Sequence, residues 1–86
     1  MSGQRLSPAL VRAIRAFGEE TGLARESNHT DPRTNYVYWQ SARSLEKLGL
    51  ARLEGVRHSG TWWELTQAGE ELRATLPVIE QQRLFA

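Results

Sequence analysis

The segment Ser44-Leu45-Glu46-Lys47-Leu48-Gly49-Leu50 marks the point where this 86-residue sequence changes from a helical to an extended pattern. Up to Leu48, apolar residues recur at helical spacing, and Gly49 is the residue type that most often ends a helix. Beyond Gly49 the apolar residues alternate with polar ones, as they do in a half-buried strand. A helix that ends at a glycine and leads directly into a strand is therefore expected at the centre of the fold.

On the N-terminal side of Gly49, the sequence predicts a long helix. Asp31 followed by Pro32 is a cap-plus-proline pair, which indicates that a helix runs over 32–48. Successive helical residues advance by about 100°, so the apolar residues gather on one side. That side carries Tyr38, Ala42 and Leu45, with Ser41 and Leu48 beside them.

The chain before residue 31 is expected to be helical at its start and weakly structured afterwards. Ser7 and Pro8 form another cap-plus-proline pair and predict a first helix over 8–21. In segment 23–30, several polar side chains compete for the backbone hydrogen bonds that a helix needs. This segment is therefore expected to be a short second helix or an irregular loop.

The chain after Gly49 is expected to form a hairpin and then a helix. Two alternating segments joined by Gly55-Val56-Arg57-His58-Ser59-Gly60 predict a hairpin over 50–65. Thr66 is a good N-cap for a last helix over 66–76. The residues of the hairpin expected to point inward are Ala51, Leu53, Trp63 and Leu65.

Length and composition restrict the class of protein. A chain of 9.8 kDa forms one small domain, assigned here to residues 1–76, with a C-terminal tail over 77–86. It has no cysteine, and no apolar run is long enough for a membrane span or a signal peptide. We expect a cytoplasmic protein without a membrane partner.

A second stripe of residues follows the helix expected over 32–48. On the side opposite the apolar residues, positions spaced by three and four carry hydrogen-bond donors and no acid. They are Arg33, Tyr36, Gln40, Arg43 and Lys47. Such a stripe can be an ordinary solvated face, but cations without an acidic neighbour favour a surface for an anion.

The order of these elements resembles that of a winged helix-turn-helix. The segment from Ser44 to Leu50, the hairpin, and then Leu65-Thr66-Gln67-Ala68-Gly69-Glu70-Glu71-Leu72 resemble the MarR-type and PadR-type transcription regulators over residues 35–80. The resemblance implies an α+β, mostly helical fold, namely a winged helix-turn-helix with a two-stranded wing hairpin.

The resemblance also implies a function. In this family the recognition helix enters the major groove and the wing contacts the backbone or the minor groove. The chain is thus expected to be a sequence-specific, double-stranded DNA-binding regulator of transcription, dimeric, without enzymatic activity or a cofactor. The implied DNA-binding residues are Arg33, Thr34, Tyr36, Gln40, Arg43 and Lys47, with Arg57 and His58 at the wing tip. The alternative is a winged-helix protein-interaction module, such as an adaptor or a phage-type inhibitor.

The tail over 77–86 carries more apolar side chains than a free chain end usually does. These are Val78, Ile79, Leu84 and Phe85. We expect them to join two molecules in a homodimer, although packing on their own domain explains them too. A third possibility is a protein partner, because Gln81-Gln82-Arg83-Leu84-Phe85 is similar to the peptides by which bacterial replication and repair proteins dock into the sliding clamp.

Metal binding and catalysis have little support in the sequence. His29, Asp31 and His58 show no ligand spacing typical of a metal site, so no metal is expected. Ser59 and His58 are adjacent on the hairpin tip, where successive side chains point apart, and no catalytic group is assigned.

Overall fold

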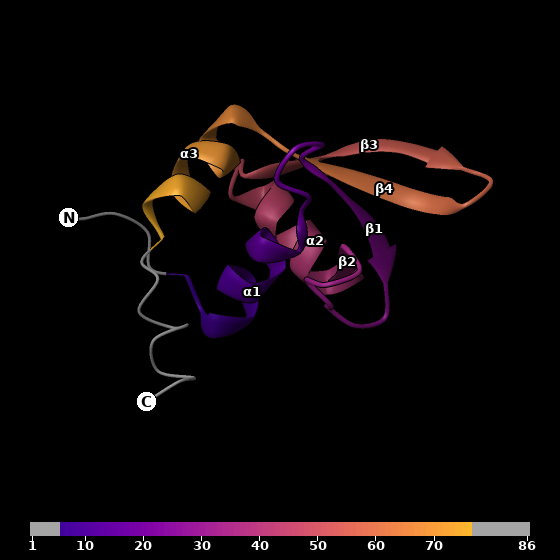
Figure 1. Ribbon diagram of the computed structural model, residues 1–86, viewed down its shortest axis with the longest axis horizontal. Coiled ribbons are helices and arrows are strands. Elements are labelled where there is room, and N and C mark those ends of the chain that lie inside the picture. The colour runs from indigo at the N-terminus through magenta and orange to yellow at the C-terminus, as the bar shows by residue number, and fades with distance from the viewer. Residues whose placement is uncertain (1–5, 77–86) are drawn as a thin grey trace.

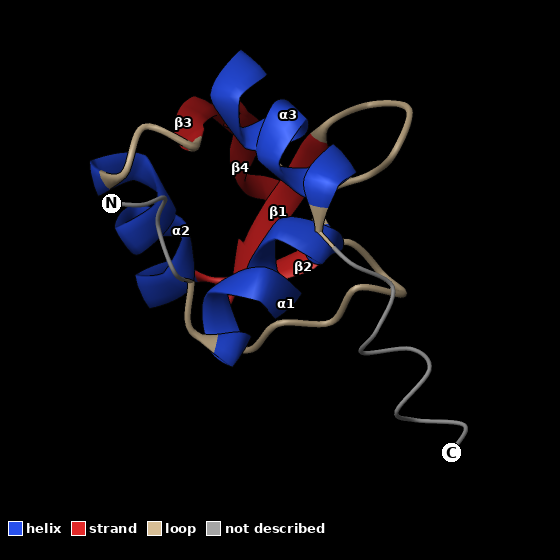
Figure 2. Ribbon diagram, turned by 90° about the vertical axis from the view of Figure 1, so that its left-hand side faces the viewer, coloured by secondary structure: helices blue, strands red, loops and turns tan. Residues whose placement is uncertain are grey.

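A computed structural model describes residues 6–76 as three helices packed on one side of a four-stranded sheet (Figures 1 and 2). The helices are α1 (Pro8–Ala16), α2 (Trp39–Lys47) and α3 (Gln67–Thr75). The strands are β1 (Leu23–Ser27), β2 (Tyr36–Tyr38), β3 (Ala51–Arg57) and β4 (Gly60–Leu65). The sheet order is β2-β1-β4-β3, in which β1 and β2 are parallel and the other pairs are antiparallel.

The expectation of a mostly helical winged helix-turn-helix with a two-stranded wing is wrong. The sheet is mixed and has four strands, and each helix has only nine residues. The segment expected to be a second helix or a loop forms β1, which lies inside the sheet between β2 and β4. Strand pairing on both sides of β1 satisfies its backbone groups, and this non-local gain outweighs its weak local preference.

The helix expected over 32–48 begins only at Trp39. Asp31 caps a tight turn instead, since its carboxylate accepts the backbone N–H of Arg33 at 3.1 Å and its carbonyl accepts that of Thr34 at 3.2 Å. Asn35 follows with a φ of 61°, which a helix cannot accommodate. The β-prone sequence Tyr36-Val37-Tyr38 then pairs with β1.

The first helix is also shorter than the expected range of 8–21, because it ends at Ala16. The chain then turns back on itself: the N–H of Gly18 donates to the carbonyl of Leu23 at 2.9 Å, and that of Gly22 donates to the carbonyl of Gly18 at 2.8 Å. Gly22 adopts a φ of 69°, a left-handed conformation that suits glycine.

The end of α2 forms as expected from the sequence. The N–H of Leu50 donates to the carbonyl of Leu45 at 2.9 Å, and the N–H of Gly49 donates to that of Glu46 at 2.9 Å. With Gly49 at a φ of 77°, this is a Schellman motif. It directs the chain from α2 straight into β3 and buries both leucines.

The hairpin expected over 50–65 is present as β3 and β4. Its register shifts between Leu53 and Gly55, so Glu54 is the extra residue of a β-bulge. Three of the four residues expected inside are buried, namely Ala51, Trp63 and Leu65. Leu53 is 49% exposed, because β3 lies at the edge of the sheet and only its first residue is buried.

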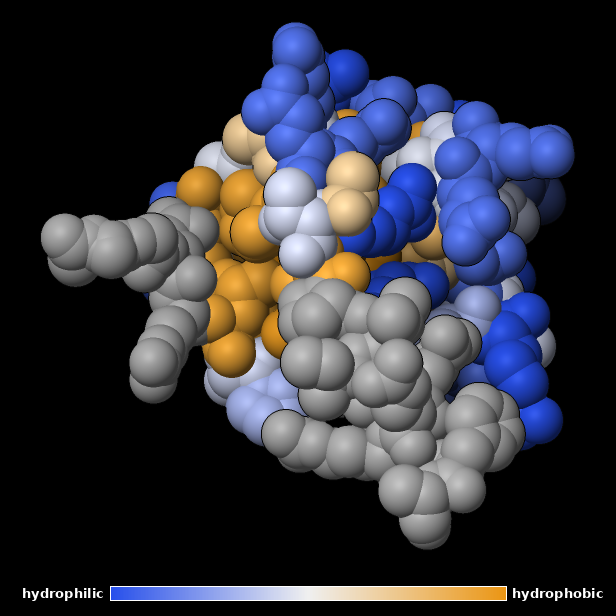
Figure 3. Space-filling model, turned by 60° about the vertical axis from the view of Figure 1, so that its left-hand side comes forward, coloured by the Kyte–Doolittle hydropathy of each residue, from blue (hydrophilic) through white to orange (hydrophobic). Residues whose placement is uncertain are grey.

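The core lies between the sheet and the helices. Its largest fully buried side chains are Phe17, Ile14, Leu45 and Val37. Partly buried leucines extend the core toward the surface, and Figure 3 shows an apolar patch on the side of the molecule where α1 and α3 lie. These leucines are Leu6, Leu10, Leu72 and Leu76. Over residues 6–76, no helix has the length and apolar character that crossing a membrane requires.

Candidate nucleic-acid interface

The exposed side of α2 carries three of the residues expected to contact DNA. Gln40, Arg43 and Lys47 are all exposed and follow one another at spacings of three and four. Among the described ion pairs none involves Arg43 or Lys47, so no described carboxylate neutralises either cation within 4.0 Å. The hydroxyl of Tyr38 donates to Oε1 of Gln40 at 3.1 Å, which orients the amide. Three of the five residues expected in the stripe of donors therefore lie on the exposed side of α2.

Arg33 and Thr34 do not belong to that stripe, contrary to expectation, because they lie in the turn that precedes β2. The side chain of Arg33 is 94% exposed, with Nε 4.0 Å from Oδ1 of Asp31. The pKa of Asp31 is lowered, chiefly because its carboxylate accepts the Arg33 backbone N–H. Arg33 can reach outward from this turn, but it does not share a helix face with Arg43.

Tyr36 lies on the sheet instead of on a helix, which also differs from the expectation. It pairs with Arg25 of β1, and the guanidinium of Arg25 lies 5.6 Å from the centre of the Tyr36 ring. On its other side Arg25 pairs with Trp62 of β4. This row of Tyr36, Arg25 and Trp62 was not identified from the sequence, because it forms only once three separate strands are in register.

Arg57 and His58 lie at the far end of the hairpin, as the sequence predicts. Arg57 ends β3, forms an ion pair with Glu54, and has its guanidinium 5.4 Å from the centre of the Trp62 ring. His58 is exposed in the turn. Arg57 therefore has an anionic and an aromatic partner in the fold, unlike the cations of α2.

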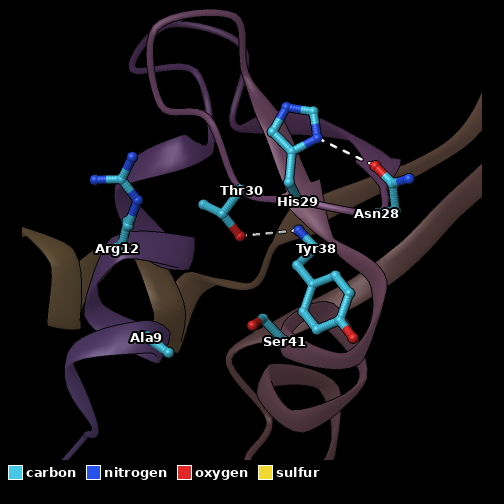
Figure 4. Close-up of a pocket in the computed structure, with 7 residues that line it drawn as sticks. All are labelled: Ala9, Arg12, Asn28, His29, Thr30, Tyr38 and Ser41. Carbon is cyan, nitrogen blue, oxygen red and sulfur yellow. Dashed lines mark hydrogen bonds between the residues drawn. The ribbon is translucent and has the colours of Figure 1, made fainter.

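A pocket of about 310 Å³ opens at the N-terminal end of α2 (Figure 4). Side chains from α1, from the chain between β1 and β2, and from the start of α2 surround it. They are Ala9, Arg12, Asn28, His29, Thr30, Tyr38 and Ser41. A second hollow shares Arg12, His29 and Thr30 and continues to Arg33. Arg12 of α1 and Arg33 of the Asp31 turn thus border these adjoining hollows at the start of α2.

Sequence reasoning missed Arg12, Thr30 and Ser41 as members of a site. Arg12 lies on the first helix, and Thr30 lies between two strands that were not expected. Only Ser41 gave a signal, as a polar residue beside the apolar side of its helix. The other two reach the pocket through tertiary packing that local patterns do not encode.

Within residues 6–76, no group of three or more metal-binding side chains is placed to hold an ion. The residues expected to mediate dimerisation or docking, Val78, Ile79, Leu84 and Phe85, lie outside the described part of the chain.

No protein-family model matches this chain, and neither the curated proteins nor the solved structures include a significant match. The likeness to MarR-type and PadR-type regulators therefore stays a prediction from the sequence.

Proposed function

We propose that the protein binds double-stranded DNA in a sequence-specific manner and regulates transcription, with α2 as the element that enters the major groove. The supporting observation is the exposed stripe of Gln40, Arg43 and Lys47, whose two cations have no described carboxylate partner. An α-helix with its side chains is about 10 to 12 Å across, which fits a major groove about 12 Å wide.

The three side chains suit different parts of the duplex. Arg43 is of the type that reads guanine through two parallel hydrogen bonds, and Gln40 is of the type that reads adenine. The bond from Tyr38 leaves the amide N–H groups of Gln40 free and restricts its rotamers, so less entropy is lost on binding. Lys47, one turn beyond Arg43, suits a phosphate contact.

The cations of β3 suit this role less well. Nε of Arg52 lies 3.0 Å from Oε1 of Glu64, and Arg57 is paired with Glu54. A phosphate that approached either arginine would also meet the carboxylate and have to compete with it. We therefore assign base contacts to α2 and only a sequence-independent backbone contact to Arg57.

The test is a titration with duplex DNA at several salt concentrations. Each neutralised phosphate should contribute about −0.9 to the slope of log K against log salt. Arg43→Ala should weaken binding more than Arg52→Ala, which removes the same charge from a paired site. The proposal fails if duplex DNA does not bind at low salt, or if the two variants lose affinity equally.

A second candidate function is that of a protein-interaction module. It is favoured by large apolar side chains on the surface near the end of α2 and along β3, namely Leu48, Leu53 and Val56. Val56 is 73% exposed, and neighbouring exposed apolar side chains are typical of protein interaction sites. If DNA binding is absent and Val56→Ser abolishes association with a protein partner, this second function replaces the first.

A further inference from the structure

Ser41 is a nearly buried polar residue that lines the pocket at the start of α2. It is only 8% exposed, and it is the one polar residue among the buried side chains of residues 6–76. None of the hydrogen bonds in this part of the chain involves its Oγ. Figure 4 shows that the hydroxyl points into the pocket between α1 and the chain around Thr30. In residues 6–76 no fully buried side-chain oxygen or nitrogen lacks a hydrogen-bond partner, so the Ser41 hydroxyl is open to the pocket, where it can meet a ligand or water.

The same pocket receives the positive end of α2. The N-cap residue Tyr38 makes no side-chain capping bond, and the first turn contains no acidic residue. The first backbone N–H groups of a helix have no partner within the helix, and the aligned peptide dipoles place partial positive charge there. No side-chain cap and no acidic residue interacts with the first N–H groups of α2. This end of the helix therefore favours the binding of an anion.

Two further elements supply donors to the pocket. Arg12 comes from α1, and among the described residues no carboxylate is paired with it. Oγ1 of Thr30 accepts the backbone N–H of Tyr38 at 3.0 Å, which leaves the hydroxyl proton of Thr30 available to an acceptor. His29 adds a ring nitrogen at the rim.

Asp31 is the one acid among the residues that line the two hollows, and it is already engaged. It borders the second hollow, accepts the Arg33 backbone N–H at 3.1 Å, and lies 4.0 Å from the Arg33 side chain. The two hollows together are therefore lined by two arginines, Arg12 and Arg33, and by one carboxylate, that of Asp31.

We propose that this pocket binds a phosphoryl group, held by Arg12, Thr30, Ser41 and the first N–H groups of α2. Donors from three elements line this one pocket, and a tetrahedral oxyanion offers several acceptor oxygens to such a set. The group can come from the backbone of bound DNA or from a free phosphate ester. The first source rests on the proposed function, whereas the second does not.

The probe is inorganic phosphate, added to the full chain without DNA and followed by amide NMR. Phosphate should shift the signals of Thr30, Gln40 and Ser41, with chloride at equal ionic strength as the control. Ser41→Ala and Arg12→Gln should each lower the affinity about tenfold or more, since each removes a hydrogen bond to a charged group. Alanine is smaller than serine and favours helix, so the first variant should keep the fold.

Two matched variants control for charge and for helix composition. Ser44→Ala changes an exposed serine of the same helix, and Arg52→Gln removes an arginine outside the pocket. Both should leave phosphate binding unchanged. Equal losses in all four variants, or no shift of the pocket signals at the highest soluble phosphate concentration, would overturn the proposal.

Adding duplex DNA to the phosphate-loaded protein distinguishes the two sources. If DNA displaces phosphate and Ser41→Ala weakens DNA binding, the pocket holds a backbone phosphate. If both bind together, or phosphate binds and DNA does not, it serves a free phosphate ester. Salt-dependent DNA binding without any phosphate binding would refute the pocket while leaving the proposed function intact.

Discussion

Gly69 of α3 lies directly against the carbonyl group of Leu50, so close that a Cβ atom on Gly69 would be 2.0 Å from that oxygen. The same carbonyl accepts the backbone N–H of Thr66 at 3.0 Å. The hydroxyl of Thr66 donates to the carbonyl of Gly49 at 2.6 Å and accepts the N–H of Gly69 at 3.1 Å. The start of α3 is thereby fixed to the segment through which the chain leaves α2.

Gly69→Ala should destabilise the protein because of this contact. Alanine favours a helix by about 1 kcal/mol over glycine, but overpacking against backbone costs about 1 to 3 kcal/mol, and here the obstacle cannot rotate away. Urea unfolding measures the difference. Gly55→Ala is the control, because nothing lies within 4 Å of its Cβ position, and it should change stability little. A stabilised Gly69→Ala variant would contradict the close approach.

Gly49→Ala should destabilise for a different reason. Its φ of 77° is costly for a residue with a Cβ, by about 1 to 2 kcal/mol, although the space around it is open. Gly49→Asn should cost less, since asparagine tolerates the left-handed conformation better. Thermal unfolding of the two variants should place asparagine between glycine and alanine. Equal stabilities for Asn and Ala would show that this terminus does not depend on the left-handed residue.

The pH dependence of stability should include a contribution from Asp31. Its pKa in the folded state is lowered from the ordinary value of 3.8, so the contribution is complete above that value and is lost as the pH falls through the lower, folded pKa. Asp31→Asn removes this titration. The melting temperatures of the two proteins should therefore converge between neutral and strongly acidic pH. A constant difference across this range would rule out the contribution.

The proposed DNA contacts should separate into two kinds. Gln40→Ala or Arg43→Ala should cost about 1 to 3 kcal/mol of binding free energy and relax the preference at one base pair. Arg57→Ala should weaken binding to all sequences alike and flatten the salt dependence. Affinities for a selected site and for random duplex distinguish the two effects. Identical losses on both DNAs for all three variants would remove the base-reading role.

The tail after Leu76 should control the oligomeric state. We expect its apolar residues to join two molecules; they are Val78, Ile79, Leu84 and Phe85. Burying each side chain between the molecules should contribute about 1.5 to 3 kcal/mol to the free energy of association. Sedimentation of the full chain should show a dimer, and a form truncated after Leu76 should be a monomer. If both are monomers of equal stability, the tail does not mediate dimerisation and is available to another partner.

Local chemistry and the hairpin over 50–65 were predictable from the sequence, whereas the pairing of β1 with β2 and β4 was not. The cap at Ser7, the cap at Thr66 and the glycine end of α2 each depend on a few adjacent residues, and all three form as expected. Asp31-Pro32 is compatible with either a helix start or a tight turn. Asn35 adopts the left-handed conformation, and its side-chain amide donates to the carbonyl of Ala16 at 2.8 Å. The turn is thus accompanied by a contact with a residue far away in the sequence.

The candidate site shows the same division. Gln40, Arg43 and Lys47 lie on one short helix, so their spacing alone indicated a shared face. Arg12, Thr30 and Ser41 belong to three elements, and their meeting depends on how α1 packs against α2. Sequence periodicity contains no information about that packing.

The bulge at Glu54 has a consequence for the aggregation of separate molecules. β3 leaves one side of its backbone unpaired for seven residues, and Leu53 and Val56 add apolar side chains there. A straight strand of this kind would be a template for edge-to-edge aggregation. The extra residue bends the strand and interrupts its regular hydrogen-bonding pattern, and the charged Glu54–Arg57 pair stands at the bend. We therefore expect this irregularity to hinder the growth of stacked sheets in concentrated solutions of the protein.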